Sequence, residues 1–131
     1  MSIVVDASVL VAALVDRGRT GQWAEDVIAS GDLHSPELVR VESANVLRRL
    51  ESGGQITTAD ANAAFEDLVE LDIQLFGFDA FAERIWQLRD TITSYDAWYV
   101  AVAEALHAPL ATLDMRLSRA NGPACEFRVP V

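Results

Sequence analysis

Ile3-Val4-Val5-Asp6-Ala7-Ser8-Val9-Leu10 is the stretch of sequence that decides the fold. The β-branched run at residues 3–5 is typical of a central strand that is covered on both faces in a parallel sheet. Asp6 ends that run, and an apolar, helix-compatible pattern follows from Ser8 to Val15. A buried strand followed at once by a helix is typical of a parallel α/β protein, and it places Asp6 where the strand turns into the helix.

The rest of the chain repeats this alternation of strand and helix. We expect further strands within residues 33–35, 71–76, 109–112 and 126–129, and helices within 21–29, 36–54, 57–70, 81–89, 94–106 and 115–120. Pro36 is expected to open the longest helix, and the apolar helix 94–106 is expected to be buried on nearly all sides. With 131 residues, these elements predict one parallel α/β sandwich, a single domain over residues 1–131.

The ionic composition excludes several classes of enzyme. The chain has ten basic and twenty acidic residues, a net charge of −10, and every basic residue is arginine. The absence of lysine excludes the P-loop phosphate clamp, Schiff-base cofactor enzymes and the receiver or phosphatase folds that use a lysine beside their aspartates.

The single cysteine and the apolar segments bear on where the protein works. Cys125 has no partner for an internal disulfide or a thiolate zinc site, which favours a reducing compartment, the cytoplasm. The apolar stretch from Val9 to Val15 lies between two aspartates with no positive residue ahead of it, so we do not interpret it as a targeting segment. No uncharged apolar run approaches the ~20 residues that cross a bilayer, and we expect a soluble protein without a membrane partner.

Two aspartates, Asp6 and Asp114, lie where a predicted strand gives way to a helix. In an open parallel sheet, ligands bind beyond the carboxyl ends of the strands, at these turns. Aspartate is also a preferred residue for capping a helix N-terminus, so capping alone would account for either residue.

Two further carboxylates lie on predicted helices. Asp96 and Thr93 have the spacing of a capping box, which is the alternative to a functional role for Asp96. Glu42 lies beside an apolar stripe, where an unpaired carboxylate is costly to bury. The alternative for Glu42 is an ion pair with a nearby arginine such as Arg49.

Together, four carboxylates at one end of one sheet would repel one another unless a cation lay among them. Hard oxygen ligands without histidine or thiolate select Mg²⁺, for which Mn²⁺ can substitute, and such ions hydrolyse phosphodiesters by activating water. Three polar side chains are placed to orient the carboxylates or contact a phosphate: Ser8, Asn45 and Thr112. Local hydrogen bonds to the backbone are the alternative for Ser8 and Thr112.

At these residues the sequence resembles PIN-domain proteins, and in particular the VapC toxins of bacterial type II toxin–antitoxin pairs. Residues 3–10 resemble the first family motif, and Glu42-Ser43-Ala44-Asn45-Val46-Leu47-Arg48-Arg49 resembles the second. The third and fourth motifs are resembled by Tyr95-Asp96-Ala97-Trp98-Tyr99-Val100-Ala101-Val102-Ala103 and Leu110-Ala111-Thr112-Leu113-Asp114. The order and separation of these motifs make the resemblance specific over most of the chain.

The resemblance implies a PIN-like three-layer sandwich with a central, mostly parallel sheet flanked by helices. It implies a Mg²⁺-dependent endoribonuclease that acts as a toxin, with an RNA substrate, a cognate antitoxin and a homodimeric state. The metal-binding, catalytic residues would be Asp6, Glu42, Asp96 and Asp114, with Ser8 and Thr112 in the same site. Some family members carry a further acidic residue where this chain has Met115, Arg116 and Leu117, so a second metal ion would be weakly held or bound only with substrate.

The net negative charge is a poor match to a polyanionic substrate. Three arginine pairs flank the motif-bearing segments, with solvated helix faces as the alternative interpretation: Arg17 and Arg19, Arg48 and Arg49, and Arg116 and Arg119. Three aromatic residues in apolar helices are expected in the core rather than as stacking platforms: Trp86, Trp98 and Tyr99.

Two other functions compete with the nuclease. A catalytically silent PIN-like interaction module would keep the fold, but the presence of all four carboxylates argues against it. A phosphatase with a nucleophilic aspartate would need a second acid two residues after Asp6, where Ser8 stands.

Overall fold

Five parallel strands form the middle layer of the molecule in a computed structural model that describes all 131 residues. The strands are β1 (Ser2–Val5), β2 (Asp32–Pro36), β3 (Ile73–Phe76), β4 (Leu110–Ala111) and β5 (Phe127–Arg128). Their order in the sheet is β3-β2-β1-β4-β5, and every neighbouring pair is parallel. The α/β architecture is confirmed, with a sheet that is entirely parallel.

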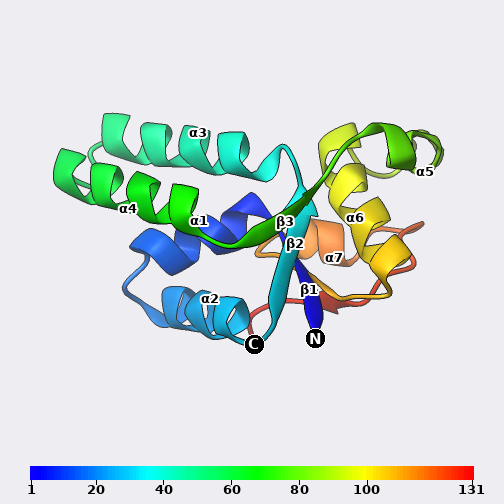
Figure 1. The fold of residues 1–131 in the computed structure, drawn as a ribbon, viewed down its shortest axis with the longest axis horizontal. Helices are drawn as coiled ribbons and strands as arrows, with labels where there is room; N and C mark the ends of the chain where they lie inside the picture. Colours follow the sequence, from blue (N-terminus) through cyan, green and yellow to red (C-terminus); the bar gives the residue numbers. More distant parts are fainter.

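Helices cover both faces of this sheet (Figure 1). One outer layer holds α1 (Ala7–Val15), α2 (Arg19–Ala29), α3 (Val39–Ser52) and α4 (Thr58–Glu70), and the other holds the 3₁₀ helix η1 (Asp79–Phe81), α5 (Ala82–Gln87), α6 (Ser94–Leu106) and α7 (Met115–Ser118). The helices α3 and α4 lie side by side and project beyond the sheet (Figure 1). None of the helices is both long and apolar enough to cross a bilayer.

Two element boundaries differ from the sequence prediction. Pro36 is the last residue of β2, paired with Phe76, and α3 begins only at Val39, so the prediction that Pro36 opens the helix is wrong. Sheet pairing overrides the helix-start signal, since the amide of Glu37 donates to the carbonyl of Phe76 at 2.9 Å. The helix predicted over 81–89 is divided into η1 and a shorter α5 that ends at Gln87.

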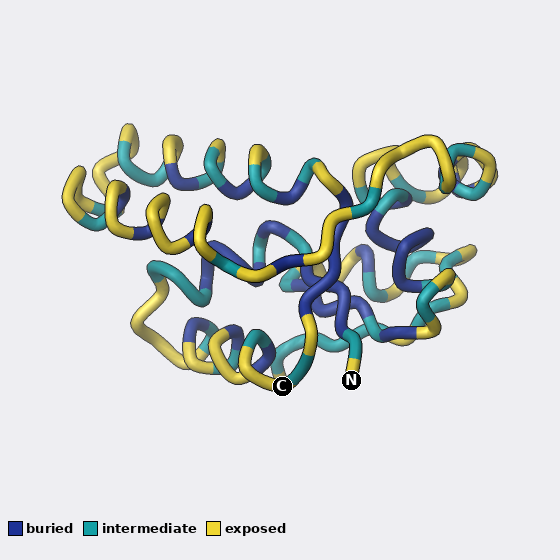
Figure 2. The backbone as a smooth tube through the Cα atoms, viewed as in Figure 1, coloured by how far each residue is buried: buried dark blue, intermediate teal, exposed yellow.

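The core lies on both faces of β1. Val4 and Val5 are fully buried, and Ile3 is 2% exposed. Figure 2 shows most of β1 and β2, β4 and much of α6 as buried backbone, whereas α3 and α4 alternate between buried and exposed turns. Trp86, expected in the core, is instead 64% exposed, because α5 contributes only Ile85 to the buried interior.

An ion pair fastens the C-terminal segment to α5 and α6. Arg84 Nε and Nη2 donate to the two carboxylate oxygens of Glu104 at 2.7 and 3.0 Å. The same Nη2 reaches the carbonyl oxygen of Gly122 at 2.9 Å, and the amide of Ala124 donates to Glu104 Oε2 at 2.7 Å. Glu104 therefore joins two helices to the segment that leads into β5.

Replacing Glu104 with glutamine should lower the free energy of unfolding at pH 7 by about 1–3 kcal/mol, because it removes a charged acceptor of several hydrogen bonds. Burial opposes ionisation of this carboxyl, but hydrogen bonds from Arg84 and Ala124 and the charge of Arg84 outweigh it and lower its pKa. The stability contributed by Glu104 is thus present above the ordinary glutamate pKa of 4.5 and lost as pH falls through the lowered value.

Urea unfolding of the wild type and the Glu104→Gln variant between pH 7 and pH 3 measures this difference. The exposed Glu66→Gln on α4 is the matched control and should behave as the wild type. A Glu104→Gln deficit that stays constant down to the lowest pH would contradict the assignment.

Candidate functional site

The candidate site lies beyond the carboxyl ends of β1 and β4. From β1 the chain builds the sheet in one direction through β2 and β3 and in the other through β4 and β5. Loops leave these two neighbouring strands in opposite directions and open a crevice, which is where open parallel sheets bind ligands. Asp6 follows β1 directly, and Asp114 lies three residues after β4.

Asp6 is held by side chains from both strand ends. The hydroxyls of Ser8 and Thr112 donate to its two carboxylate oxygens, each at 2.5 Å. The amide of Val9 also donates to Asp6 at 3.2 Å, so the residue caps α1 as well. The capping interpretation and the functional one therefore describe the same side chain.

The two hydroxyls also fix the loop that follows β4. Ser8 Oγ accepts the amide of Leu113 at 3.1 Å, and Thr112 Oγ1 accepts the amide of Asp114 at 3.0 Å. Thr112 is fully buried, and both hydroxyls thus act as donor and acceptor. Ser8 and Thr112 lie beside Asp6 as the sequence predicted, and they set where the loop carrying Asp114 begins.

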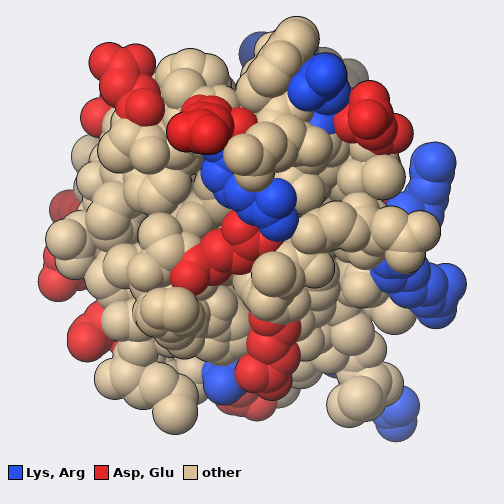
Figure 3. All heavy atoms as spheres, turned by 90° about the vertical axis from the view of Figure 1, so that its right-hand side faces the viewer, with Lys and Arg blue, Asp and Glu red and all other residues tan.

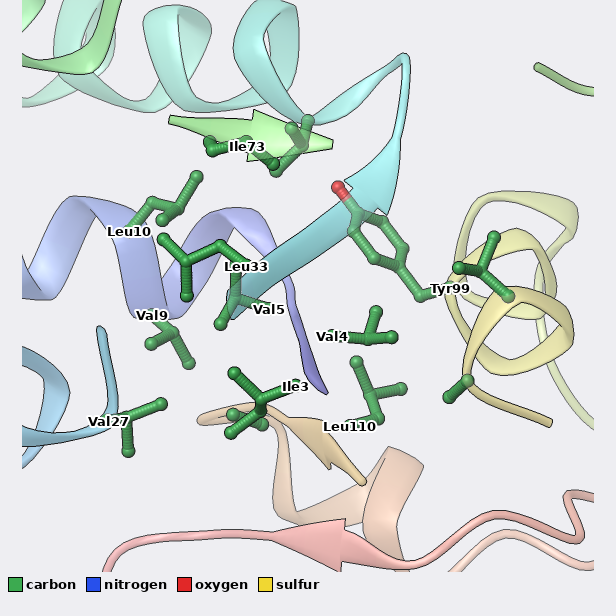
Figure 4. Packing of buried hydrophobic residues seen from close by; sticks show 14 of the residues in the cluster. Ile3, Val4, Val5, Val9, Leu10, Val27, Leu33, Ile73, Tyr99 and Leu110 are labelled. Atoms are coloured by element: carbon green, nitrogen blue, oxygen red, sulfur yellow. The ribbon is translucent and has the colours of Figure 1, made fainter. Parts of the chain in front are cut away.

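Glu42 reaches the site from the first turn of α3. Its Oε1 accepts a hydrogen bond from the hydroxyl of Tyr99 on α6 at 2.5 Å. Figure 4 shows the Tyr99 ring pointing from α6 across the sheet, with its oxygen at the carboxyl end of β2. The hydrogen-bond partner of the Glu42 carboxylate is therefore Tyr99, and not Arg49, which was the ion-pair alternative.

Tyr99 is a site residue that sequence reasoning placed only in the core. The side chain is 2% exposed, so its ring does belong to the core, while its hydroxyl supports Glu42. Tyr99 follows Asp96 by three residues on α6, which puts both on one face of the helix. The three-residue spacing between Asp96 and Tyr99 was the signal in the sequence that could have placed Tyr99 at the site.

Asp96 and Asp114 line one groove at the edge of the site. Asp96 lies in the first turn of α6, where the hydroxyl of Thr93 accepts its amide at 3.2 Å. Asp114 is exposed and caps α7 by accepting the amides of Arg116 and Leu117 at 3.0 and 3.1 Å. The groove has a volume of 820 Å³ and runs along the loop before α6 and the segment around α7.

None of the four carboxylates at the site forms an ion pair. Burial is the main cause that raises the pKa values of Asp6, Glu42 and Asp96. Repulsion adds to burial, since the Asp96 charge raises the pKa of both Asp6 and Glu42, and Asp114 raises that of Asp96. The ion pairs of the molecule lie elsewhere, at Arg84 and Glu104, Arg17 and Asp60, and the N-terminus and Asp32.

This arrangement has the donor chemistry of a site for a hard divalent cation. Its candidate ligands are all carboxylate oxygens. Burial and repulsion disfavour the charged forms of Asp6, Glu42 and Asp96, and a bound cation would offset both effects. As they stand, no three acidic, histidine or cysteine side chains are close enough to hold one ion in common. The carboxylates must therefore turn further inward to share an ion.

Asn45, Arg48 and Arg17 have side-chain partners other than the four carboxylates. Asn45 is exposed on α3, and its Oδ1 accepts from Arg48 Nε at 3.0 Å. Arg17 lies in the loop before α2, 3.8 Å from Asp60, beside a separate cavity of 330 Å³ that contains none of the predicted site residues.

Comparison with known proteins gives a consistent result. The PIN domain family model matches residues 3–123. The chain is 40% identical over 127 residues to VapC ribonuclease Mb0985 of Mycobacterium bovis, and the match covers 97% of both chains. It is 36% identical over 127 residues to ribonuclease VapC1 of Mycobacterium tuberculosis, and that match covers 96% of both chains. Among solved structures, VapC20 of Mycobacterium tuberculosis, described as a Sarcin-Ricin loop cleaving toxin, matches with a TM-score of 0.67 at 18% identity, over 88% of this chain and 92% of that one. FitAcB of Neisseria gonorrhoeae matches with a TM-score of 0.69 at 18% identity over 95% of both chains.

Without a cation, the repulsion at this site should make the protein less stable at neutral pH than in mild acid. A carboxyl whose pKa is raised on folding takes up its proton earlier in the folded state, so stability should rise as pH falls through the raised values. The gain should end near the ordinary values of 3.8 for aspartate and 4.5 for glutamate. Replacing Asp96 with asparagine removes one charge and should raise the melting temperature at pH 7 by roughly 2–5 °C.

Differential scanning calorimetry in a chelator and in excess Mg²⁺ measures both effects. Mg²⁺ should raise the melting temperature of the wild type and have much less effect on Asp96→Asn. Asp67→Asn, an exposed change on α4, is the matched control for loss of one negative charge. Equal melting temperatures for Asp96→Asn and the wild type in chelator would show that the site carboxylates do not repel one another.

Proposed function

Because the chain belongs to the PIN-domain VapC ribonuclease toxin family of type II toxin–antitoxin systems, we propose that it is a Mg²⁺-dependent endoribonuclease. Its catalytic and metal-binding residues would be Asp6, Glu42, Asp96 and Asp114. The reaction would be hydrolysis of RNA phosphodiesters by water.

The convergence of four carboxylates is the observation that carries this proposal. They come from four different places in the chain, after β1, on α3, on α6 and after β4. The charge of Asp96 adds to the raised pKa of Asp6 and of Glu42, and the charge of Asp114 adds to that of Asp96. Unpaired carboxylates that lie close together lower the stability of the fold, because each adds charge repulsion and a cost of desolvation. Stability therefore does not explain why they are close together. Such clusters are typical of functional sites.

The neighbouring hydroxyls give each carboxylate a fixed direction. Ser8 and Thr112 hold Asp6 through both of its oxygens, and Tyr99 holds Glu42. Each hydroxyl opposes the rise in pKa that burial causes and would orient its carboxylate toward a bound ion. A divalent ion there would lower the pKa of water and balance negative charge on the phosphate.

The other candidate functions receive less support. A silent interaction module would leave the carboxylates without a purpose. An aspartate-based phosphatase is disfavoured because Ser8, in the position of its second acid, is committed to hydrogen bonds with Asp6 and Leu113.

Partners also form part of the proposal. One solved relative is described as VapBC2 from Rickettsia felis bound to promoter DNA, and this chain covers 98% of it at a TM-score of 0.65 and 15% identity. We propose that this chain, too, binds a cognate antitoxin, and that it forms a homodimer. Several large apolar side chains on α3 and α4 are exposed in the monomer and are available for such contacts: Val41, Phe65 and Val69.

The acidic site would favour an antitoxin that inserts an arginine, through charge-assisted hydrogen bonds to Glu42 or Asp96. Replacing that arginine by glutamine should weaken the complex, and excess Mg²⁺ should compete with the antitoxin, both measured by isothermal titration calorimetry. Inhibition insensitive to both changes would mean that the antitoxin blocks RNA from outside the site.

The Asp6→Asn variant should lose RNA cleavage by at least 100-fold while remaining folded, because it removes one ligand charge and keeps the side chain's size. Cleavage of structured RNA by the purified protein in Mg²⁺, with circular dichroism as the test of folding, measures this. Induced expression should stop bacterial growth for the wild type and not for Asp6→Asn. The exposed Asp67→Asn is the control, and a fully active Asp6→Asn protein would exclude the mechanism.

A further inference from the structure

The groove that carries Asp96 and Asp114 is also lined by arginines, and this feature is independent of the carboxylate motifs. Arg89 lies on the loop before α6, and Arg116 and Arg119 lie in and after α7. The three arginines face the same groove as the two aspartates. Of the three arginine pairs noted in the sequence, only Arg116 and Arg119 line it, and Arg89 belongs to none of those pairs.

Charge is distributed unevenly around this groove. Its lining holds three arginines and three aspartates, so it is balanced, although the whole chain carries a net charge of −10. Figure 3 shows the face formed by α5 and α6, where several arginine side chains lie along one edge and others lie next to acidic side chains in the middle of the face. An anionic strand would meet less repulsion in the groove than over most of the surface.

An exposed aromatic side chain, Trp86, lies against Arg89, one of the arginines that line the groove. The guanidinium carbon of Arg89 lies 4.5 Å from the centre of the Trp86 ring, and Arg89 Nη1 donates to the carbonyl oxygen of Trp86 at 2.9 Å. Trp86 is nonetheless 64% exposed, so much of its indole remains open to solvent. The ring therefore fixes the arginine that lines the groove and offers a surface of its own.

On these observations, and resting on the proposed ribonuclease function, we infer that this groove binds single-stranded RNA next to the cleaved bond. Arg89, Arg116 and Arg119 contact its phosphates, and Trp86 stacks on an unpaired base. Arginine contacts to phosphate are independent of sequence and sensitive to salt. Stacking on an aromatic ring requires a base that is free of a duplex, so Trp86 contributes to the binding of unpaired RNA and not of a duplex.

The inference is tested by measuring RNA binding in the Asp6→Asn background, in which the RNA is not consumed. The probes are a labelled, unstructured RNA of about 12 nucleotides and a blunt duplex containing the same strand. Fluorescence anisotropy over a series of salt concentrations gives the dissociation constant and its salt dependence. Trp86→Ala should weaken binding of the single strand roughly tenfold and that of the duplex little, and Trp86→Phe should restore most of the affinity.

Arg89→Gln should weaken binding several-fold and reduce the salt slope by about 0.7, the value for one phosphate contact on a single strand. Arg17→Gln removes the same charge from a loop beside the separate cavity and should leave the slope unchanged. In the cleaving protein, Arg89→Gln should raise KM and leave kcat nearly unchanged, since these contacts form in substrate and transition state alike.

The outcomes separate this inference from the ribonuclease proposal. If the wild type cleaves RNA while the Trp86 and Arg89 variants bind and cleave as it does, the groove inference is wrong and the nuclease stands. If RNA binding depends on both residues but the wild type cleaves nothing, the nuclease proposal is wrong and the groove inference stands. Variants that lose antitoxin binding and keep RNA affinity would also overturn the inference, because the groove would then be a protein interface.

Discussion

The structure depends on holding negative charges together at the carboxyl ends of β1 and β4. The position of Asp6 is fixed by hydrogen bonds, because the hydroxyls of Ser8 and Thr112 donate to its two carboxylate oxygens. The same hydroxyls accept hydrogen bonds from backbone amides of the loop after β4. This network joins two neighbouring strands where their loops diverge, and it fixes the backbone amide of Asp114 through the hydroxyl of Thr112. The repulsion that results costs stability, which a core built on the fully buried β1 residues can offset.

Much of the fold and of the site could be predicted from the sequence because its signals are local. The run Ile3-Val4-Val5 identified a central strand, and the position of Asp6 just after it identified a ligand-binding turn. The same reasoning placed Asp114 after β4, and helical spacing placed Asp96 at the start of α6. These predictions needed only the alternation of strands and helices and the rule that parallel strands present their carboxyl ends at one edge.

The features that sequence reasoning missed depend on long-range packing. Tyr99 and Glu42 are 57 positions apart, and only the docking of α6 against the sheet brings them together. Trp86 was placed in the core because its neighbours are apolar, but a helix of six residues is too short to reveal which side faces solvent. At Pro36, a local helix-start signal was overridden by pairing with β3.

The central claim is that the four carboxylates form one cation site. No three of them are close enough in the structure to hold one ion in common, so the claim requires that they move when an ion binds. The most direct measurement is an anomalous difference map from a crystal of this protein grown with Mn²⁺. The account predicts a peak among Asp6, Glu42, Asp96 and Asp114, with the carboxylates turned toward it, and no such peak in Asp6→Asn. A well-diffracting crystal in excess Mn²⁺ with no peak at these residues, or with one only at a distant surface site, would contradict it.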